Sequence, residues 1–192
     1  MKPLFVFLLT LVSGNCGAGL LAANLDRSVI TEVVNNVRVI DVSTKASRAA
    51  RVNEEFCAPN VLRTGADSRA EMVAADHTVT RVGSNTVFSF QRDSREMNLE
   101  RGSVLFQSPS GRGGGVIHTA AASAAVLGTT MIVSATKAGT MKVMLLEGKG
   151  KVTVPDGKSV TLRAGQLAMV LPGGRLGRFS IFNSRCRCLR RV

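Results

Sequence analysis

Downstream of residue 23, short runs of alternating hydrophobic and polar residues are separated by turn-forming residues. This alternation places successive side chains on opposite faces of a strand. The runs 71–74 and 78–82 flank Asp76 and His77, which predicts a β-hairpin. Similar runs occupy 32–42, 86–90, 99–106, 116–119, 131–134, 140–146, 151–154, 159–162 and 167–171. The pattern predicts an all-β fold of short antiparallel strands and hairpins.

Two stretches of the chain echo each other. Segments 64–70 and 119–125 match at Thr, Ser and Ala positions, and each is followed by paired strand-like runs. We interpret them as parts of two similar units in a β-sandwich or a solenoid-like β-roll. Chance similarity between Ala- and Thr-rich segments is the alternative. Segment 45–60 is polar enough to be a loop or a short helix, and the strand pattern fades after 172–174.

The first residues have the pattern of a secretory leader. Lys2 precedes an apolar run that is too short to span a bilayer, and small residues follow through Ala22 and Ala23. We expect a signal peptide helix over residues 1–23, with cleavage after Ala23 or Ala22. A minority interpretation is a lipoprotein acylated at Cys16. The mature chain would be exported, and no later apolar run is long enough for a membrane helix.

The net charge of +12 has to be located before it is interpreted. Segment 172–192 contains six arginines and no acidic residue, so much of the excess lies in a predicted basic, poorly ordered tail. Its last arginines could contact an anionic polymer or membrane surface: Arg185, Arg187, Arg190 and Arg191. Because Trp and Tyr are absent, the sequence argues against a nucleic-acid interface of basic and stacking residues.

No catalytic, cofactor or metal site is predicted. His77 and His118 are the only histidines, and no Gly-x-Ser-x-Gly elbow accompanies them. After leader cleavage three cysteines remain, Cys57, Cys186 and Cys188, and they permit one bridge and one spare thiol. Their pairing stays open, and Cys57 could equally be a small buried residue. We therefore expect a protein that is not an enzyme.

Six segments in a fixed order resemble the FecR-type extracytoplasmic domain, in a stand-alone and secreted form. These segments are 61–71, 76–86, 99–104, 126–131, 146–152 and 162–166. The resemblance assigns 24–171 to one FecR-like β domain. It also implies that the motif glycines mark structural turns: Gly65, Gly83, Gly102, Gly128, Gly148 and Gly165.

The resemblance implies a periplasmic or extracellular recognition and signalling module. The best-known relatives relay the occupancy of an outer-membrane iron-complex transporter to a sigma factor, through a cytoplasmic portion and a membrane helix. We find neither feature in this sequence, so no link to iron or a sigma factor is predicted. The leading hypothesis is a non-catalytic module that binds another envelope protein by strand edges or loops. The alternatives are binding of an anionic cell-wall or surface polymer, or a structural assembly role.

Overall fold

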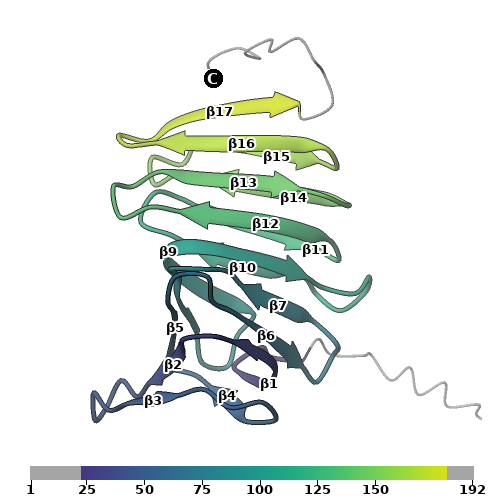
Figure 1. Cartoon of the computed structure of the whole chain (residues 1–192). Helices are drawn as coiled ribbons and strands as arrows, with labels where there is room; N and C mark the ends of the chain where they lie inside the picture. Colours follow the sequence, from purple (N-terminus) through teal and green to yellow (C-terminus); the bar gives the residue numbers. More distant parts are fainter. Residues whose placement is uncertain (1–22, 181–192) are drawn as a thin grey trace, which may run out of the picture.

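The computed structural model describes residues 23–180, and within that range the chain forms strands and turns without a helix. The strands belong to two sheets that stack as successive rungs of one β-roll (Figure 1). Sheet A consists, in order, of β4 (Glu55–Cys57), β1 (Arg27–Val34), β6 (Arg69–Ala74), β7 (Val79–Val82), the second half of β9 (Glu96–Gln107), β12 (Thr130–Ala135), β13 (Met141–Leu145), β16 (Gln166–Leu171) and β17 (Arg175–Ser180). Sheet B consists of β3 (Ser47–Ala49), β2 (Val37–Ile40), β5 (Val61–Thr64), β8 (Val87–Phe90), the first half of β9, β10 (Gly115–His118), β11 (Ser123–Leu127), β14 (Lys149–Thr153) and β15 (Ser159–Arg163). The all-β prediction is confirmed.

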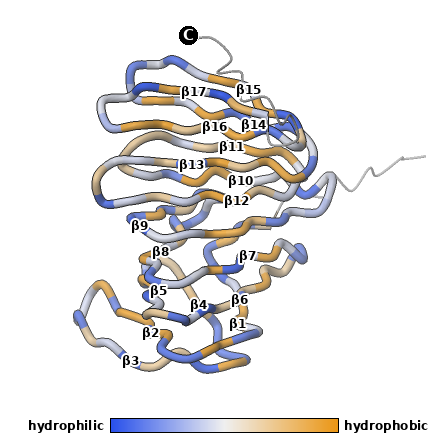
Figure 2. Tube along the Cα trace, turned by 45° about the horizontal axis from the view of Figure 1, so that its top comes forward, coloured by the Kyte–Doolittle hydropathy of each residue, from blue (hydrophilic) through white to orange (hydrophobic). Residues whose placement is uncertain are grey.

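The core lies between the two sheets, because alternate residues of almost every strand point inward. Figure 2 shows hydrophobic and hydrophilic residues alternating along the strands. Phe88 and Phe90 both point inward from β8, and their rings meet edge to face with centroids 5.0 Å apart. Phe56 of β4 packs against Phe90 at 5.8 Å. Such aromatic pairs contribute about 0.5–1.5 kcal/mol beyond their buried area, so this cluster stabilises the N-terminal rungs.

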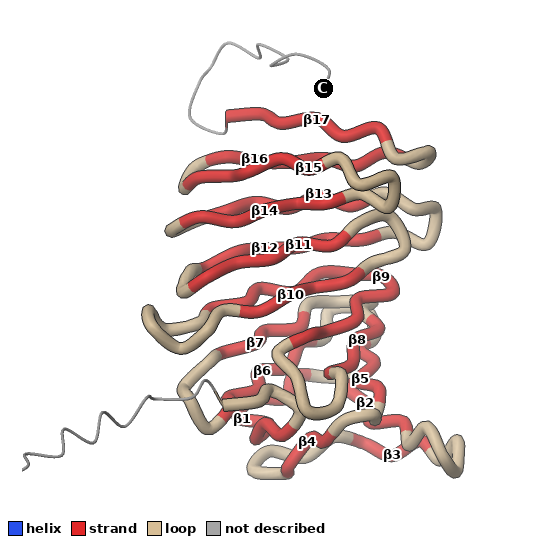
Figure 3. The backbone as a smooth tube through the Cα atoms, turned by 180° about the vertical axis from the view of Figure 1, so that it is seen from behind, coloured by secondary structure: helices blue, strands red, loops and turns tan. Residues whose placement is uncertain are grey.

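The chain forms hairpins within one sheet and then crosses to the other. β6–β7 and β12–β13 are hairpins of sheet A, whereas β10–β11 and β14–β15 are hairpins of sheet B. The long strand β9 joins the sheets, since its first half pairs with β8 and its second half with β7 and β12. Only the pairing of β9 with β10 is parallel among the described strands. Figure 3 shows this stack from behind.

Several sequence predictions can be located in this architecture. The β6–β7 hairpin is confirmed, with exposed His77 at its turn (φ 65°). The two echoing segments are not structurally equivalent, because 64–70 crosses from sheet B to sheet A and 119–125 leads from β10 into β11 of one sheet. Segment 45–60, expected as a loop or short helix, contains β3 and β4.

The strand pattern also continues beyond residue 171, where the sequence predicted that it ends. Arg175–Ser180 forms β17, which pairs with β16 along its whole length. The short turn 172–174 reverses the chain with glycines at φ 82° and 74°, a conformation that L side chains rarely adopt. Residues 175–180 therefore belong to the roll. The rest of the predicted tail and most of the predicted leader lie outside the described residues.

Candidate functional site

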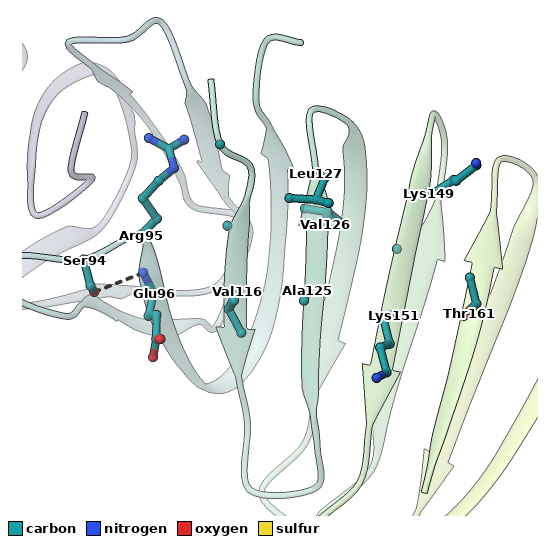
Figure 4. Close-up of a pocket in the computed structure, with 13 residues that line it drawn as sticks. Ser94, Arg95, Glu96, Val116, Ala125, Val126, Leu127, Lys149, Lys151 and Thr161 are labelled. Atoms are coloured by element: carbon teal, nitrogen blue, oxygen red, sulfur yellow. Dashed lines mark hydrogen bonds between the residues drawn. The ribbon is translucent and has the colours of Figure 1, made fainter. Parts of the chain in front are cut away.

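The candidate ligand groove is a hollow of about 530 Å³ on the outer face of sheet B. It runs from the start of β9 across β10, β11 and β14 to β15 (Figure 4). Its residues include Glu96 at one side and Lys149 and Lys151 toward the other. The groove therefore joins an apolar centre to a basic flank.

Strand register explains why the hollow forms there. Val116, Ala125, Lys151 and Thr161 oppose one another on successive strands, so their side chains stand in one row on the outer face. Because the side chains of Val116 and Ala125 are shorter than those of the lysines, the surface of the sheet is depressed at the centre of the row. Leu127, two residues from Ala125 on the same face, is 78% exposed. Such an exposed leucine beside small residues is a surface on which an apolar side chain of a ligand could pack.

A buried arginine supports one wall of the groove. The Arg95 side chain is 13% exposed, and its guanidinium contacts the carboxylate of Asp76, which is 2% exposed, at 2.6 Å. Its Nε donates to the carbonyl of Gly114 at 2.6 Å, and Nη2 donates to Thr78 Oγ1 at 3.1 Å. Nη1 also donates to the carbonyl of Ala23. Arg95 thus ties the N-terminal residues, the β6–β7 turn and the glycine-rich loop together.

This network fixes the charge state of Asp76. Burial raises the pKa of the Asp76 carboxyl, but hydrogen bonds from Thr78 and the Arg95 guanidinium outweigh burial, so the pKa lies below its usual value of 3.8. The carboxylate is therefore ionised at neutral pH. From the sequence, Asp76 was placed in the turn of a hairpin and Arg95 was not identified, since a single sequence carries no sign of their pairing.

The structure places the six motif glycines in two kinds of position. Gly65, Gly83, Gly128, Gly148 and Gly165 lie in connections between strands. Gly102 instead lies inside β9 with φ 95°, and a Cβ there would lie 2.5 Å from the backbone Cα of Thr86. The expectation of a turn at Gly102 is therefore corrected to a position inside a strand, next to the register shift at which β9 passes from one sheet to the other.

Hydroxyl groups, which the sequence analysis did not single out, pack the corner next to these glycines. Thr64 and Thr86 are buried, and the backbone N–H of Thr86 donates to Thr64 Oγ1 at 2.9 Å. Thr64 Oγ1 donates to the carbonyl of Gly83 at 2.6 Å, and the N–H of Ser103 donates to Thr86 Oγ1 at 3.0 Å. These bonds satisfy backbone groups where the ladder is interrupted, so the corner is structural.

The remaining candidate residues do not gather into a metal-binding cluster within residues 23–180. His118 contacts Glu96 Oε2 through Nε2 at 2.8 Å on the outer face of sheet B. No group of three or more His, Cys, Asp or Glu residues in the described part could hold a metal ion. Cys57 is half-buried in β4, and burial raises the pKa of its thiol. Cys16, Cys186, Cys188, Arg185, Arg187, Arg190 and Arg191 lie outside the described residues.

The C-terminal end of the roll exposes an edge on β17. Thr136 N–H donates to Thr140 O at 3.0 Å, which identifies the hydrogen-bonded pairs of the β12–β13 hairpin. Along an antiparallel strand, the backbone N–H and C=O groups of successive residues face opposite neighbouring strands. The residue pairings of β12 with β13, β13 with β16 and β16 with β17 therefore determine which residues of β17 face β16. The N–H of Gly177 therefore faces β16, whereas those of Leu176 and Arg178 face the edge. No described strand pairs with that edge.

The neighbouring edge on β15 is partly covered by the chain's own side chains. Arg178 Nη1 donates to the carbonyl of Thr161 at 3.2 Å. The Arg163 N–H donates to Gln166 Oε1 at 2.9 Å. Of the two strand edges at this end, β17 is therefore the more available for pairing.

No helix within residues 23–180 has the length and apolar character needed to cross a membrane. The fold has solved relatives: two crystal structures, at 1.65 and 2.50 Å, of a proposed anti-sigma factor from Parabacteroides distasonis ATCC 8503. Both superpose with a TM-score of 0.55, at 21% and 20% sequence identity. The similarity covers 62% of this chain and 59% of that chain, so it shows the fold alone.

No curated protein matches the chain. A family model does: residues 60–152 match the model described as FecR protein. This range runs from β5 to the end of β14 and includes β9, Arg95 and most of the groove. Residues 60–152 of this chain are therefore similar to a FecR domain.

Proposed function

We propose that this chain is a non-catalytic recognition and signalling module of the bacterial cell envelope, and that it binds another envelope protein through the edge of β17. The match to the FecR model supports a signalling or regulatory role, and FecR domains in general are periplasmic. The single observation that carries the binding mode is the outward-facing ladder of Leu176 and Arg178. An extended segment of a partner can add a strand to such an edge, with affinity from main-chain hydrogen bonds.

The two ends of the roll differ in a way that supports this choice of edge. At the N-terminal end, the outermost strands β3 and β4 are each three residues long, and short edge strands resist pairing with other chains. At the C-terminal end, β17 is six residues long. An edge of six residues offers about three outward-facing N–H groups, since every second residue faces outward.

The groove supplies a second surface for the same partner. Its lysines, Lys149 and Lys151, stand on the outer face of β14 and form no ion pair with a described residue. Unpaired surface lysines attract acidic partners and accelerate association. The partner is therefore expected to present an acidic segment toward sheet B.

Proline scanning of β17 tests the edge directly. Arg178→Pro removes an N–H that faces the free edge, whereas Arg178→Ala removes the same side chain and keeps the N–H. We expect Arg178→Ala to retain a partner cross-linked through a photoreactive residue at Ser180, and Arg178→Pro to lose it. Gly177→Pro removes an N–H that bonds β16 and should lower the melting temperature.

The partner has to be recovered from envelope fractions and shown to bind the purified full chain. Equal cross-linking by Arg178→Pro and Arg178→Ala, both folded by circular dichroism, would exclude the β17 edge as the binding site. Absence of any specific adduct with the chain that carries the photoreactive residue at Ser180 and no other substitution would contradict the recognition role itself.

The contacts of the N-terminal residues bear on export and on the site of leader cleavage. Leu25 is fully buried and its N–H donates to the carbonyl of Ser94 at 3.0 Å. The carbonyl of Ala23 is an acceptor for Arg95, and cleavage after Ala23 would remove that acceptor. We therefore propose cleavage after Ala22. The mass of the periplasmic protein should correspond to a chain that begins at Ala23, and recovery of uncut chain from the cytosol would contradict export.

A further inference from the structure

Three arginines stand in one row across the outer face of sheet B, and none of them lines the groove. Arg38 of β2 is directly opposite Arg63 of β5, Arg63 is opposite Val87 of β8, and Val87 is opposite Arg101 of β9. Directly opposed residues have Cβ atoms about 5 Å apart. Strands are about 4.8 Å apart, so Arg63 and Arg101 are separated by two strand spacings. Three cations thus gather within the reach of arginine side chains.

Repulsion within such a row destabilises the folded chain unless an anion binds between the arginines. Like charges directly opposite each other across strands are destabilising. The arginines border a cavity of about 230 Å³ whose lining contains no carboxylate and includes the side chains of Asn36, Ser47 and Asn85. Among the described residues, Arg63 forms no side-chain hydrogen bond or ion pair. The guanidinium of Arg63 is therefore available to a ligand.

A bulge in β9 brings the third arginine into the row. The register shifts between Val87 and Phe88, so Leu99 opposes Phe88 and Arg101 opposes Val87, while Glu100 is left between them. Without the bulge, Glu100 would oppose Val87 and would place a carboxylate beside Arg63. Bulges often re-aim side chains at functional sites. Glu100 is 59% exposed and contacts Arg101 Nη1 at 3.2 Å, so one acid remains at the margin of the row.

One arginine is held in position before any ligand binds. Arg38 Nε donates to Ser47 Oγ at 2.7 Å, and Nη2 donates to the carbonyl of Ser47 at 2.8 Å. These two bonds fix the plane of the guanidinium and leave Nη1 without a described partner. A fixed guanidinium loses less side-chain entropy when it binds.

We propose that Arg38, Arg63 and Arg101 form a binding site for a phosphate group. Arginine forks match the oxygens of phosphate and carboxylate in a bidentate manner. A phosphate dianion balances two guanidinium charges, whereas a single carboxylate balances one, and Glu100 already offsets part of the third. The phosphate could be free in solution or part of a lipid headgroup. The site lies away from β17, so it does not rest on the proposed function.

Thermal unfolding of the full chain with and without phosphate tests this site. We expect inorganic phosphate to raise the melting temperature relative to sodium chloride of equal ionic strength, because a ligand of the native state stabilises it. Arg63→Met should weaken phosphate binding at least tenfold by calorimetry. In the absence of phosphate the same variant should be as stable as the parent or more stable, since the like-charge pair is removed. The exposed Arg175→Met variant, outside the site, is the matched control and should bind phosphate like the parent.

Vesicles distinguish the two sources of the phosphate. Binding to phosphatidate vesicles but not to phosphatidylcholine vesicles, lost in Arg63→Met, identifies a lipid headgroup. Binding of inorganic phosphate without vesicle binding identifies a free phosphate. Equal affinity of the parent and Arg63→Met for every probe, or binding of none of them, would overturn the proposal.

Discussion

The two halves of this chain share one roll but differ in their charges. Residues 1–100 contain 11 acidic and 11 basic residues, whereas residues 101–192 contain 2 acidic and 14 basic residues. Besides the buried pair Arg95–Asp76, four of the described ion pairs between acidic residues and arginines on different strands or turns lie wholly in the first half: Arg27–Glu55, Arg48–Glu54, Arg69–Glu32 and Arg81–Glu71. The described part of the second half has Lys158–Asp156. The whole net charge therefore lies in the second half of the chain.

We infer from this difference that the apolar core stabilises both halves, whereas the excess positive charge of the second half serves the proposed binding of a partner. Both halves bury the same kind of apolar core, with Phe88 and Phe90 in the first half and Met131, Val143 and Leu162 in the second. Exposed ion pairs contribute about 0–1 kcal/mol each, so the extra pairs of the first half do not explain the fold. The unpaired cations of the second half instead favour acidic partners.

The buried Arg95–Asp76 pair should matter most to stability. Arg95→Met leaves the Asp76 carboxylate buried without its cation, which costs about 3–5 kcal/mol. Arg81→Met breaks the exposed pair with Glu71 and should cost about 0–1 kcal/mol. Denaturant unfolding measures the free energy of unfolding of both variants. Similar decreases for the two would show that the Arg95 network contributes no more to stability than an exposed ion pair.

Gly102 should be the most sensitive of the motif glycines. Gly102→Ala places a Cβ at φ 95° against the backbone of Thr86, and backbone strain of this kind costs about 1–3 kcal/mol before the clash is counted. Gly157→Ala has a similar φ of 86° but meets no atom within 4 Å, so it should cost about 1 kcal/mol. Equal free energies of unfolding for the two variants would argue against a bend of β9 at Gly102.

Acid should weaken the first half through Asp76. Its pKa is lower in the folded chain than the usual 3.8, so its stabilising contribution is complete above about pH 4. This contribution is lost as the pH falls through the folded-state pKa. Asp76→Asn should therefore lower stability at pH 7 and flatten the decline below pH 4. An unchanged slope in a pH series of unfolding curves would contradict ionisation of Asp76 in the fold.

The groove lysines should affect binding and leave stability almost unchanged. Replacing Lys149 and Lys151 by Gln should change the free energy of unfolding by no more than about 0.5 kcal/mol, since both are exposed. It should slow association with the partner and reduce the dependence of the association rate on salt. Replacing Lys45, an exposed lysine of the first half, is the control. Equal association rates for both variants would show that the groove lysines do not contribute to binding of the partner.

The sequence was sufficient for most of the strands, although not for β3, β4 and β17, and it was not sufficient for the side-chain pairs that cross between strands. Alternation predicted the β6–β7 hairpin and the strand that contains Phe88 and Phe90, because both depend on neighbours in the chain. The partnership of Asp76 with Arg95 depends on how the β6–β7 turn packs against β9, and no local pattern encodes it. The resemblance to FecR domains was confirmed by the family match, but it gave no indication of β17.

The arginine row, too, could not be predicted from the local sequence pattern. Arg38, Arg63 and Arg101 are widely separated in the chain, and only the registers of β2, β5, β8 and β9 align them. The bulge at Glu100 could not be foreseen from alternation, which would have placed Glu100 and not Arg101 opposite Val87. Strand existence follows from the local pattern, whereas register and bulges follow from the packed sheet.

Amide hydrogen exchange in β17 of the isolated chain tests the open edge most directly. The N–H groups of Gly177 and Phe179 bond to β16 and should exchange slowly, whereas those of Leu176 and Arg178 face outward and should exchange fast. Binding of the partner should then protect Leu176 and Arg178 selectively. Slow exchange of Leu176 and Arg178 in the isolated chain would mean that the edge is already paired, and would contradict the account.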